Sequence, residues 1–162
     1  MSLIPPETRT LVGKRLGAPV SAPIHAEDAE RFAFAAGDTN PIYFDDAAAR
    51  AAGHRTRVVP PGFLVWALEP PRPLGALRED GLWRDTGTPV PLRVKRVLYG
   101  GEEWDYHAAV HPGDTITAET RLASLEEKTG GSGPFVLMTT ETTYTNQAGE
   151  VVAVARGQRI AR

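Results

Sequence analysis

The sequence predicts an α+β fold in which a group of helices is followed by an antiparallel sheet. In its first half, apolar residues recur with helical period between acidic starts and glycine ends. In the second half the period changes to two, and short turn sequences separate the alternating segments. Between the halves lies "FLVWAL", at residues 63–68, which is apolar nearly all round and predicts a buried helix. Helices segregated from strands in this way are typical of α+β domains.

Three helices are expected. Residues 25–36 place their alanines and one phenylalanine on a single face, and Gly37 is a natural stop. Residues 45–53 form a second, alanine-rich helix with acids at its start and a glycine at its end. A third begins in "PPGFLVWALEP", because prolines suit a first turn, and the prolines at 70 and 71 end it.

The remaining chain predicts one long loop and a meander of strands within a single domain, 1–162. Residues 70–91 are rich in proline, glycine and charge, and a loop of this length is often a lid or a partner-binding segment. The sequences "HPGD", "KTGGSG" and "NQAG" predict the turns, with proline and glycine central in the first. The strands are expected at about residues 104–110, 115–125, 135–145 and 150–160.

Composition excludes several classes of protein. Hydrophobic residues make up 41% and charged residues 23%, as in ordinary globular proteins. The formal net charge of −2 gives no reason to expect nucleic acid or an anionic membrane as a partner. Cysteine is absent, which excludes thiolate chemistry and agrees with a cytoplasmic location. The start "MSLIPPETRT" does not resemble a signal peptide, and no window is apolar for long enough to span a bilayer.

Common catalytic and cofactor motifs are also absent. The four histidines form no pair with the spacing of a metal site, so neither a metal nor another cofactor is expected. "GGSG" joins two strands and does not open a helix, which argues against a phosphate loop. There is no G-x-S-x-G elbow for a serine nucleophile.

The loop "GDTNPIYFDD" is the strongest candidate for chemistry. Asp38 lies just past a helix end, and Asp38 or Asn40 could simply shape the loop through an Asx-turn. Alternatively, the loop carries a reactive carboxylate close to the start of the apolar helix. There, the N–H of Gly62 could bind a developing oxyanion.

The segment "AAGDTNPIYFDDAAARAAG", followed by "PPGFLVWAL", resembles the signature of MaoC-like dehydratases, the (R)-specific enoyl-thioester hydratases. "GGEEWDYHAAVHPGDTITAETRLASLEEKTG" and "TTETTYTNQAGEVVAVARGQRI" resemble the sheet of that family's N-terminal-type module, so the resemblance covers about residues 20–162. It implies a hot-dog fold, an antiparallel sheet wrapped around a long central helix and normally paired into a dimer. It also implies a lyase of fatty-acid metabolism acting on acyl-CoA or acyl-carrier-protein thioesters.

Carried over by position, the resemblance places Asp38 on the catalytic aspartate of the family. Asn40 and Pro41 fall on its structural pair, with Asn40 also a candidate for substrate contact, and Gly62 falls on the glycine of the oxyanion hole. Tyr43 stands where the family has its catalytic histidine. A phenol titrates near pH 10 and is a poor base at neutrality.

Three hypotheses follow from that substitution. The chain is the substrate-holding subunit of a hydratase whose second hot-dog chain supplies the Asp/His pair. Alternatively, it is a self-sufficient homodimer with Asp38 as base and Tyr43 as orienter or acid. A third possibility is an acyl-thioester-binding module without turnover.

Outside the loop, a few further residues are candidates for binding. Arg55 and Arg57 could meet the phosphates of CoA or a phosphopantetheine arm, or be solvated loop residues. Trp66 and Trp104 are expected in the core, where either could line an acyl tunnel. Trp83, in the long loop, is expected to contact a partner or act in a lid.

Overall fold

The computed structural model describes residues 2–69, 73–79, 90–94 and 96–162. Its centre is a five-stranded, wholly antiparallel sheet of order β1-β3-β4-β5-β2. The strands are β1 Val20–Pro23, β2 Val97–Tyr106, β3 Thr115–Gly130, β4 Gly133–Thr145 and β5 Val151–Ala161. The helices are α1 Pro6–Arg9, α2 Ala26–Ala36, α3 Asp46–Ala51 and α4 Phe63–Ala67, with 3₁₀ turns η1 Pro41–Tyr43 and η2 Leu74–Ala76.

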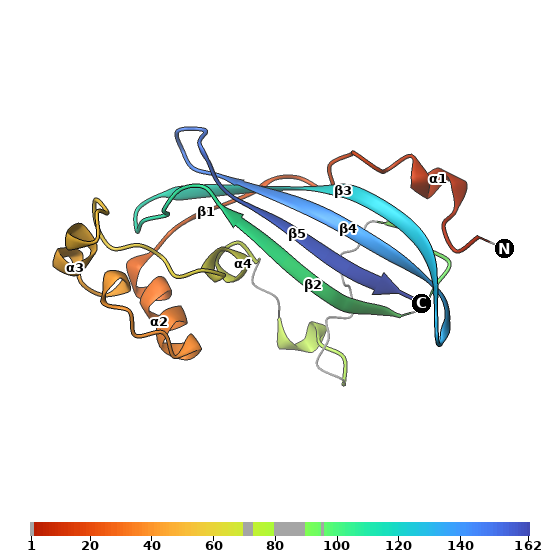
Figure 1. Cartoon of the computed structure of the whole chain (residues 1–162), viewed down its shortest axis with the longest axis horizontal. Coiled ribbons are helices and arrows are strands. Elements are labelled where there is room, and N and C mark those ends of the chain that lie inside the picture. Colours follow the sequence, from red (N-terminus) through yellow and green to blue (C-terminus); the bar gives the residue numbers. More distant parts are fainter. Residues whose placement is uncertain (1, 70–72, 80–89, 95) are drawn as a thin grey trace.

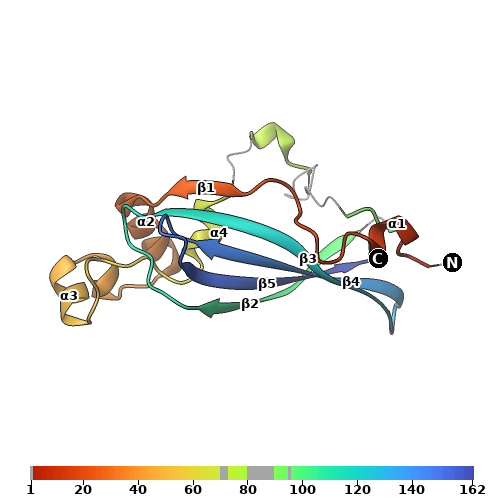
Figure 2. The ribbon, with the colours of Figure 1, turned by 90° about the horizontal axis from the view of Figure 1, so that it is seen from above.

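Three of the four helices, α2, α3 and α4, lie toward one end of the curved sheet. Figures 1 and 2 show α2 and α3 grouped at one end of the molecule, with α4 between them and the strands, and α1 at the opposite end. The expectation of helices followed by an antiparallel sheet is therefore confirmed. Only β3, β4 and β5 form a meander, because β2 pairs with β5 and not with β3, which follows it in the chain. None of the helices in the described ranges has the length and apolar character needed to cross a membrane.

The first two predicted helices are confirmed, together with the local signals that delimit them. Gly37 ends α2 in the left-handed conformation, with φ of 70°. The side chain of Asp45 caps α3 by accepting hydrogen bonds from the N–H groups of Ala47, at 2.6 Å, and Ala48, at 3.4 Å. These caps depend on neighbours in the chain, which is why the sequence alone predicts them.

The strand predictions are confirmed for β3, β4 and β5 and need correction elsewhere. The strand expected at 104–110 begins at Val97 and ends at Tyr106, with an irregularity between Tyr99 and Gly101. The strand β1 was not predicted, because a four-residue strand that ends in proline is too short to show a period. It forms by pairing with β3. In the predicted turn, Gly113 has φ of 92°.

Two apolar clusters fill the concave side. The larger lies between the sheet and the helices α2 and α4, and includes Phe63, Leu64, Ile116, Tyr144 and Val152. A second cluster lies near the other end of the sheet, where Ile4 and Val90 pack with residues of β3, β4 and β5. Different segments therefore cover the two ends of one face.

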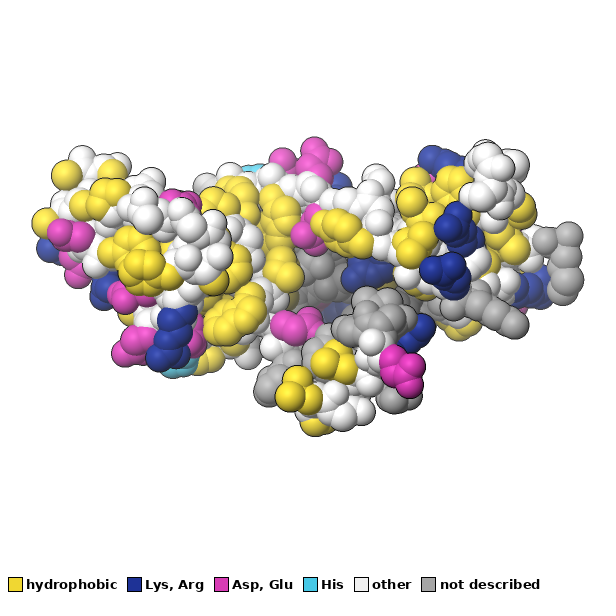
Figure 3. Space-filling model, turned by 90° about the horizontal axis from the view of Figure 1, so that it is seen from below, with side chains coloured by type: hydrophobic (Ala, Val, Ile, Leu, Met, Phe, Trp, Pro, Cys, Tyr) yellow, Lys and Arg dark blue, Asp and Glu magenta, His cyan; other side chains and the backbone are white. Residues whose placement is uncertain are grey.

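The central helix is much shorter than expected. It comprises five residues, Phe63–Ala67, and the prediction of a long helix buried on all sides is wrong. Phe63 and Leu64 are 1% and 3% exposed, whereas Val65 and Trp66 are 45% and 53% exposed. Trp66 therefore lies outside the core that was expected to contain it, because only one side of α4 packs against the sheet. Figure 3 shows the face with α2 and α4, where apolar side chains reach the surface.

Trp104, which was also expected in the core, is partly buried and packs against the larger cluster. The predicted lid, residues 70–91, lies largely outside the described residues, and Trp83 is among those not described. In its described part, Leu74–Ala76 form the turn η2.

Candidate functional site

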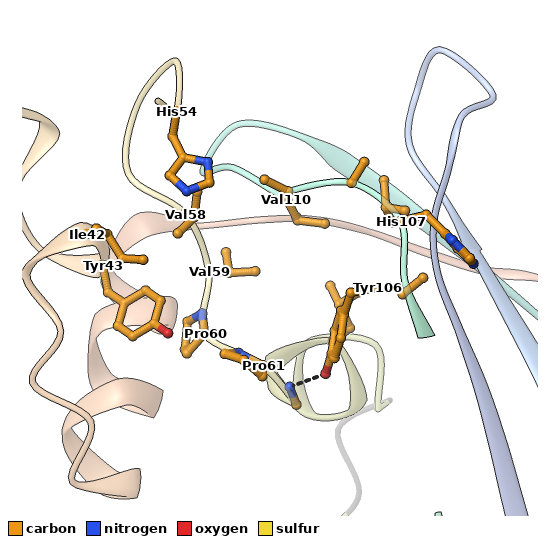
Figure 4. Close-up of a pocket in the computed structure, with 16 residues that line it drawn as sticks. Ile42, Tyr43, His54, Val58, Val59, Pro60, Pro61, Tyr106, His107 and Val110 are labelled. Atoms are coloured by element: carbon orange, nitrogen blue, oxygen red, sulfur yellow. Dashed lines mark hydrogen bonds between the residues drawn. The ribbon is translucent and has the colours of Figure 1, made fainter. Parts of the chain in front are cut away.

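A cavity of about 390 Å³ lies between η1, the segment leading into α4 and the end of β2 (Figure 4). Its wall is mostly apolar and includes Val58, Val59, Leu64, Val110 and Val152. The exceptions are two tyrosines, two histidines and a backbone N–H, contributed by Tyr43, His54, Gly62, Tyr106 and His107. A mostly apolar cavity with a few polar groups is the usual form of a small-molecule site.

Tyr43 is held in the cavity wall by the local structure of its loop. The side chain of Asn40 accepts a hydrogen bond from the N–H of Ile42 at 3.2 Å, and Pro41 begins the 3₁₀ turn. The side chain of Tyr43 is only 8% exposed. Figure 4 shows its hydroxyl directed into the space beside Pro60.

The pKa of Tyr43 is raised above its ordinary value. Burial is the largest cause, followed by the charge of Asp38 and a hydrogen bond with the Asp38 carboxylate. The phenol is therefore protonated at neutral pH, and because an ionised carboxylate only accepts, Tyr43 donates this bond. Tyr43 can hold a proton in place, but it cannot act as a general base at neutrality.

Asp38 is partly buried, and its side chain shapes its own loop. The carboxylate accepts a hydrogen bond from the N–H of Asn40 at 3.1 Å, which confirms the Asx-turn interpretation. Asp38 is not among the residues that line the cavity, whereas Tyr43 is. The Asp38 carboxylate therefore acts on the cavity through its effect on the neighbouring Tyr43 phenol.

The N–H of Gly62 was expected to face the loop that holds Asp38. Instead it donates a hydrogen bond to the hydroxyl of Tyr106 at 2.9 Å (Figure 4). Gly62 has φ of 82°, a left-handed conformation that suits glycine and turns its N–H toward β2. Tyr106 was not among the site residues predicted from the sequence. Its only signal was the alternation that puts Trp104 and Tyr106 on one face of the strand.

Arg55 and Arg57 form ion pairs away from the cavity wall. Arg55 Nη2 lies 2.6 Å from Asp114 Oδ1, and Arg57 pairs with Glu30 and, at 3.3 Å from Nε to Oδ1, with Asp46. Both guanidinium groups thus brace the segment that leads into α4. The side chain of Arg55 remains 59% exposed and that of Arg57 26%.

The other two binding candidates also lie elsewhere. Asn40 is exposed and uses its side chain to start η1. Trp66 lines a separate open depression of about 710 Å³ with Phe63, His25 and Asp28. Of the candidate site residues predicted from the sequence, the structure brings Tyr43 and Gly62 together in the cavity wall.

A buried polar cluster supports the cavity from behind. His111 Nδ1 contacts the carbonyl oxygens of Arg57, at 2.8 Å, and Thr56, at 3.2 Å, so this nitrogen carries the proton. Asp114, 5% exposed, accepts from the His111 N–H, from Gln147 and from Arg55. Burial raises the pKa of Asp114, but these hydrogen bonds and the charge of Arg55 outweigh burial, so the pKa is lowered.

His54 lines the cavity and also meets this cluster. Its ring lies edge-to-face with that of His111, with centroids 6.2 Å apart. Within the described ranges, no group of three histidine, aspartate or glutamate side chains is placed to hold a metal ion.

Comparison with protein families identifies the architecture. The family described as "FAS1-like, dehydratase domain region" matches residues 10–155. A "Probable enoyl-CoA hydratase alpha subunit" of Thermomonospora curvata is 33% identical over 159 residues, covering 90% of this chain and 47% of that protein. A UPF0336 protein of Parafrankia sp. is 32% identical over 148 residues, covering 91% of this chain and 89% of that protein. The chain thus spans about half the length of the first relative and most of the second.

Solved structures share the fold. The ChsH1-ChsH2 complex of Mycobacterium tuberculosis matches with a TM-score of 0.74 and 24% identity, covering 95% of this chain and 90% of that one. The HadBC (3R-hydroxyacyl-ACP dehydratase) complex of the same organism matches with a TM-score of 0.65 and 20% identity, covering 89% and 95%. A MaoC-like dehydratase from Rhodospirillum rubrum matches with a TM-score of 0.60 and 20% identity, covering 90% and 91%. At these identities the likeness concerns the fold alone.

Proposed function

The chain belongs to the FAS1-like dehydratases, with the hot-dog fold of MaoC-like dehydratases, and from this premise we propose that it is one subunit of an enoyl-thioester hydratase. In this proposal it holds the acyl thioester, on CoA or on a carrier protein, while a second hot-dog chain supplies the Asp/His pair. Water adds its oxygen to C3 and a proton goes to C2, or the reverse in dehydration. No electron is transferred, so the reaction requires no redox cofactor.

The observation that carries the proposal is the state of Tyr43. Hydration needs a group that takes a proton from water, and the Tyr43 phenol, whose pKa is raised by burial and by Asp38, keeps its own proton. Even at the ordinary phenol pKa of about 10, less than about one molecule in three hundred is ionised at pH 7.5, and here the pKa is higher. The cavity therefore has the form of a binding site, with its base expected from another chain.

The comparisons agree with a two-chain assembly. One relative is named an alpha subunit, and two of the similar structures are complexes named for two different chains. The ten-residue strand β2 is an edge of the sheet within the described residues, and long edges of this kind are usually covered by another chain.

Hydration of crotonyl-CoA, measured with and without the candidate partner, tests the proposal. The isolated chain should be nearly inactive, and activity should appear when a hot-dog chain with an intact Asp/His pair is added. The substitution Asp38→Asn removes the charge of the carboxylate without unfolding the loop, because an asparagine oxygen still accepts the hydrogen bond from the Asn40 N–H. In the assembly it should cost far less than the corresponding change in the partner. A half-exposed aspartate that does not line the cavity, Asp105, provides the control as Asp105→Asn.

The alternative function is a self-sufficient homodimer, in which Asp38 is the base and Tyr43 orients water. The hydrogen bond between Tyr43 and Asp38 is the feature that favours it. Robust turnover by the isolated chain, abolished by Asp38→Asn and not by Asp105→Asn, would establish the homodimer and overturn the two-chain proposal. Thioester binding without turnover in any assembly would indicate the non-catalytic module.

A further inference from the structure

Tyr106 lies at the end of β2 and forms part of the cavity wall opposite Tyr43 (Figure 4). Its hydroxyl oxygen accepts the hydrogen bond from the Gly62 N–H at 2.9 Å. A phenol that accepts a hydrogen bond still has its own proton to donate. Within the described part of the chain, no acceptor for that proton is found.

The other polar groups of the wall are committed or point elsewhere. The Gly62 N–H is used by Tyr106, and the Tyr43 hydroxyl lies across the cavity, where the Asp38 carboxylate helps to raise its pKa. Figure 4 shows the imidazole of His107 directed away from the enclosed space and that of His54 at the opposite end from Tyr106. The Tyr106 hydroxyl is therefore the uncommitted donor beside Gly62.

Resting on the proposed function, we propose that the Tyr106 hydroxyl binds the carbonyl oxygen of the acyl thioester. The thioester oxygen then receives its hydrogen bond from the phenol, and the Gly62 N–H acts one step behind it. Accepting from that N–H polarises the phenol, which strengthens the bond that the phenol donates. Tyr106 takes the direct role that the resemblance assigns to Gly62.

Aromatic stacking fixes the phenol in position. The rings of Tyr106 and Trp104 stack with centroids 5.6 Å apart and an interplanar angle of 15°. Trp104 stacks in turn on Tyr144, at 5.2 Å and 23°, and Tyr144 is only 6% exposed. Because the stacked rings of Trp104 and Tyr144 hold the Tyr106 phenol in place, this donor needs little rearrangement when the thioester carbonyl binds. Tyr106 itself is 50% exposed, so the cavity can be reached from outside.

Two ligands that differ in one oxygen test the assignment. Butyryl-CoA is a thioester that cannot be hydrated, and S-butyl-CoA is the thioether without the carbonyl oxygen. Calorimetric titration of the purified protein, with its partner subunit where the two co-purify, gives both affinities. Tyr106→Phe should weaken butyryl-CoA binding about two- to tenfold, the range of one neutral hydrogen bond, and leave S-butyl-CoA binding unchanged.

The same strand offers a matched control. Tyr99 is 70% exposed and does not line the cavity, so Tyr99→Phe should change neither affinity. The infrared band of a ¹³C-labelled thioester carbonyl gives a readout that a structural role would not move. It should shift to lower frequency on binding to the wild-type protein, and this shift should shrink in Tyr106→Phe.

Each other outcome overturns the assignment in a recognisable way. An equal loss for both ligands would make Tyr106 a structural residue. Tighter thioester binding by Tyr106→Phe would mean that the phenol blocks the Gly62 N–H. If the substitution leaves thioester binding unchanged, the role proposed for Tyr106 is refuted, but the proposed function is not. If neither ligand binds the wild-type protein, the proposed function fails and this inference fails with it.

Discussion

Replacing Asp114 by alanine should destabilise the protein by about 1–4 kcal/mol, because this carboxylate joins the segment before α4 to the turn after β2. Asp114 is 5% exposed and accepts hydrogen bonds from the His111 N–H at 2.9 Å, from Arg55 at 2.6 Å and from Gln147 at 3.0 Å. Leaving the buried His111 N–H without an acceptor costs about 1–3 kcal/mol. The half-exposed Arg55 regains water, so its share is at most about 1 kcal/mol.

Urea unfolding at pH 7 measures this loss, with two variants as controls. Asp114→Asn keeps an oxygen acceptor for the His111 N–H, so its cost should be smaller, about 1 kcal/mol. Asp105→Ala removes a half-exposed ion pair with Arg156 and should cost less than about 1 kcal/mol. A loss in Asp114→Ala no larger than that of Asp105→Ala would refute the reasoning.

The same residue predicts part of the response to acid. The pKa of Asp114 is lowered in the folded protein, so its charged form favours the folded state. This stabilisation is fully present above the ordinary aspartate pKa of about 4 and is lost as pH falls toward the lowered value. Between pH 5 and 2, the wild-type protein should therefore lose more stability than Asp114→Asn does. Parallel curves over that range would show that Asp114 does not contribute.

Two further predictions concern the proposed function. The substitution Tyr43→His restores the histidine of the resembled family beside Asp38 and should raise the rate of crotonyl-CoA hydration by the isolated chain. A positioned general base typically raises a reaction rate about a hundred- to ten-thousand-fold. If the variant folds and binds the thioester but shows no gain in rate, the loop lacks more than this one group. Because β2 leaves its outer edge open within the described residues, the protein should sediment as a dimer, homomeric or with a second hot-dog chain. Purely monomeric sedimentation at micromolar concentration, with and without that chain, would contradict continuation of the sheet.

The features that can be predicted from the sequence are mostly local. The caps at Gly37 and Asp45 and the Asx-turn at Asp38 depend on residues within a few positions of each other, so their patterns survive in a linear reading. The alternation of β3, β4 and β5 likewise reports which residues face the core. That Tyr43 stands in place of a histidine is, by contrast, implied only by the resemblance to the MaoC-like dehydratases.

The tertiary structure alone decided which groups meet. Gly62 and Tyr106 are 44 residues apart, and Arg55 and Asp114 are 59 apart, so no local pattern links them. The length of α4 and the exposure of Trp66 also depend on what packs against the helix, whereas composition records only that the segment is apolar. Side-chain direction in a strand is periodic and readable, but the partner across a cavity is set by how strands and helices pack in three dimensions.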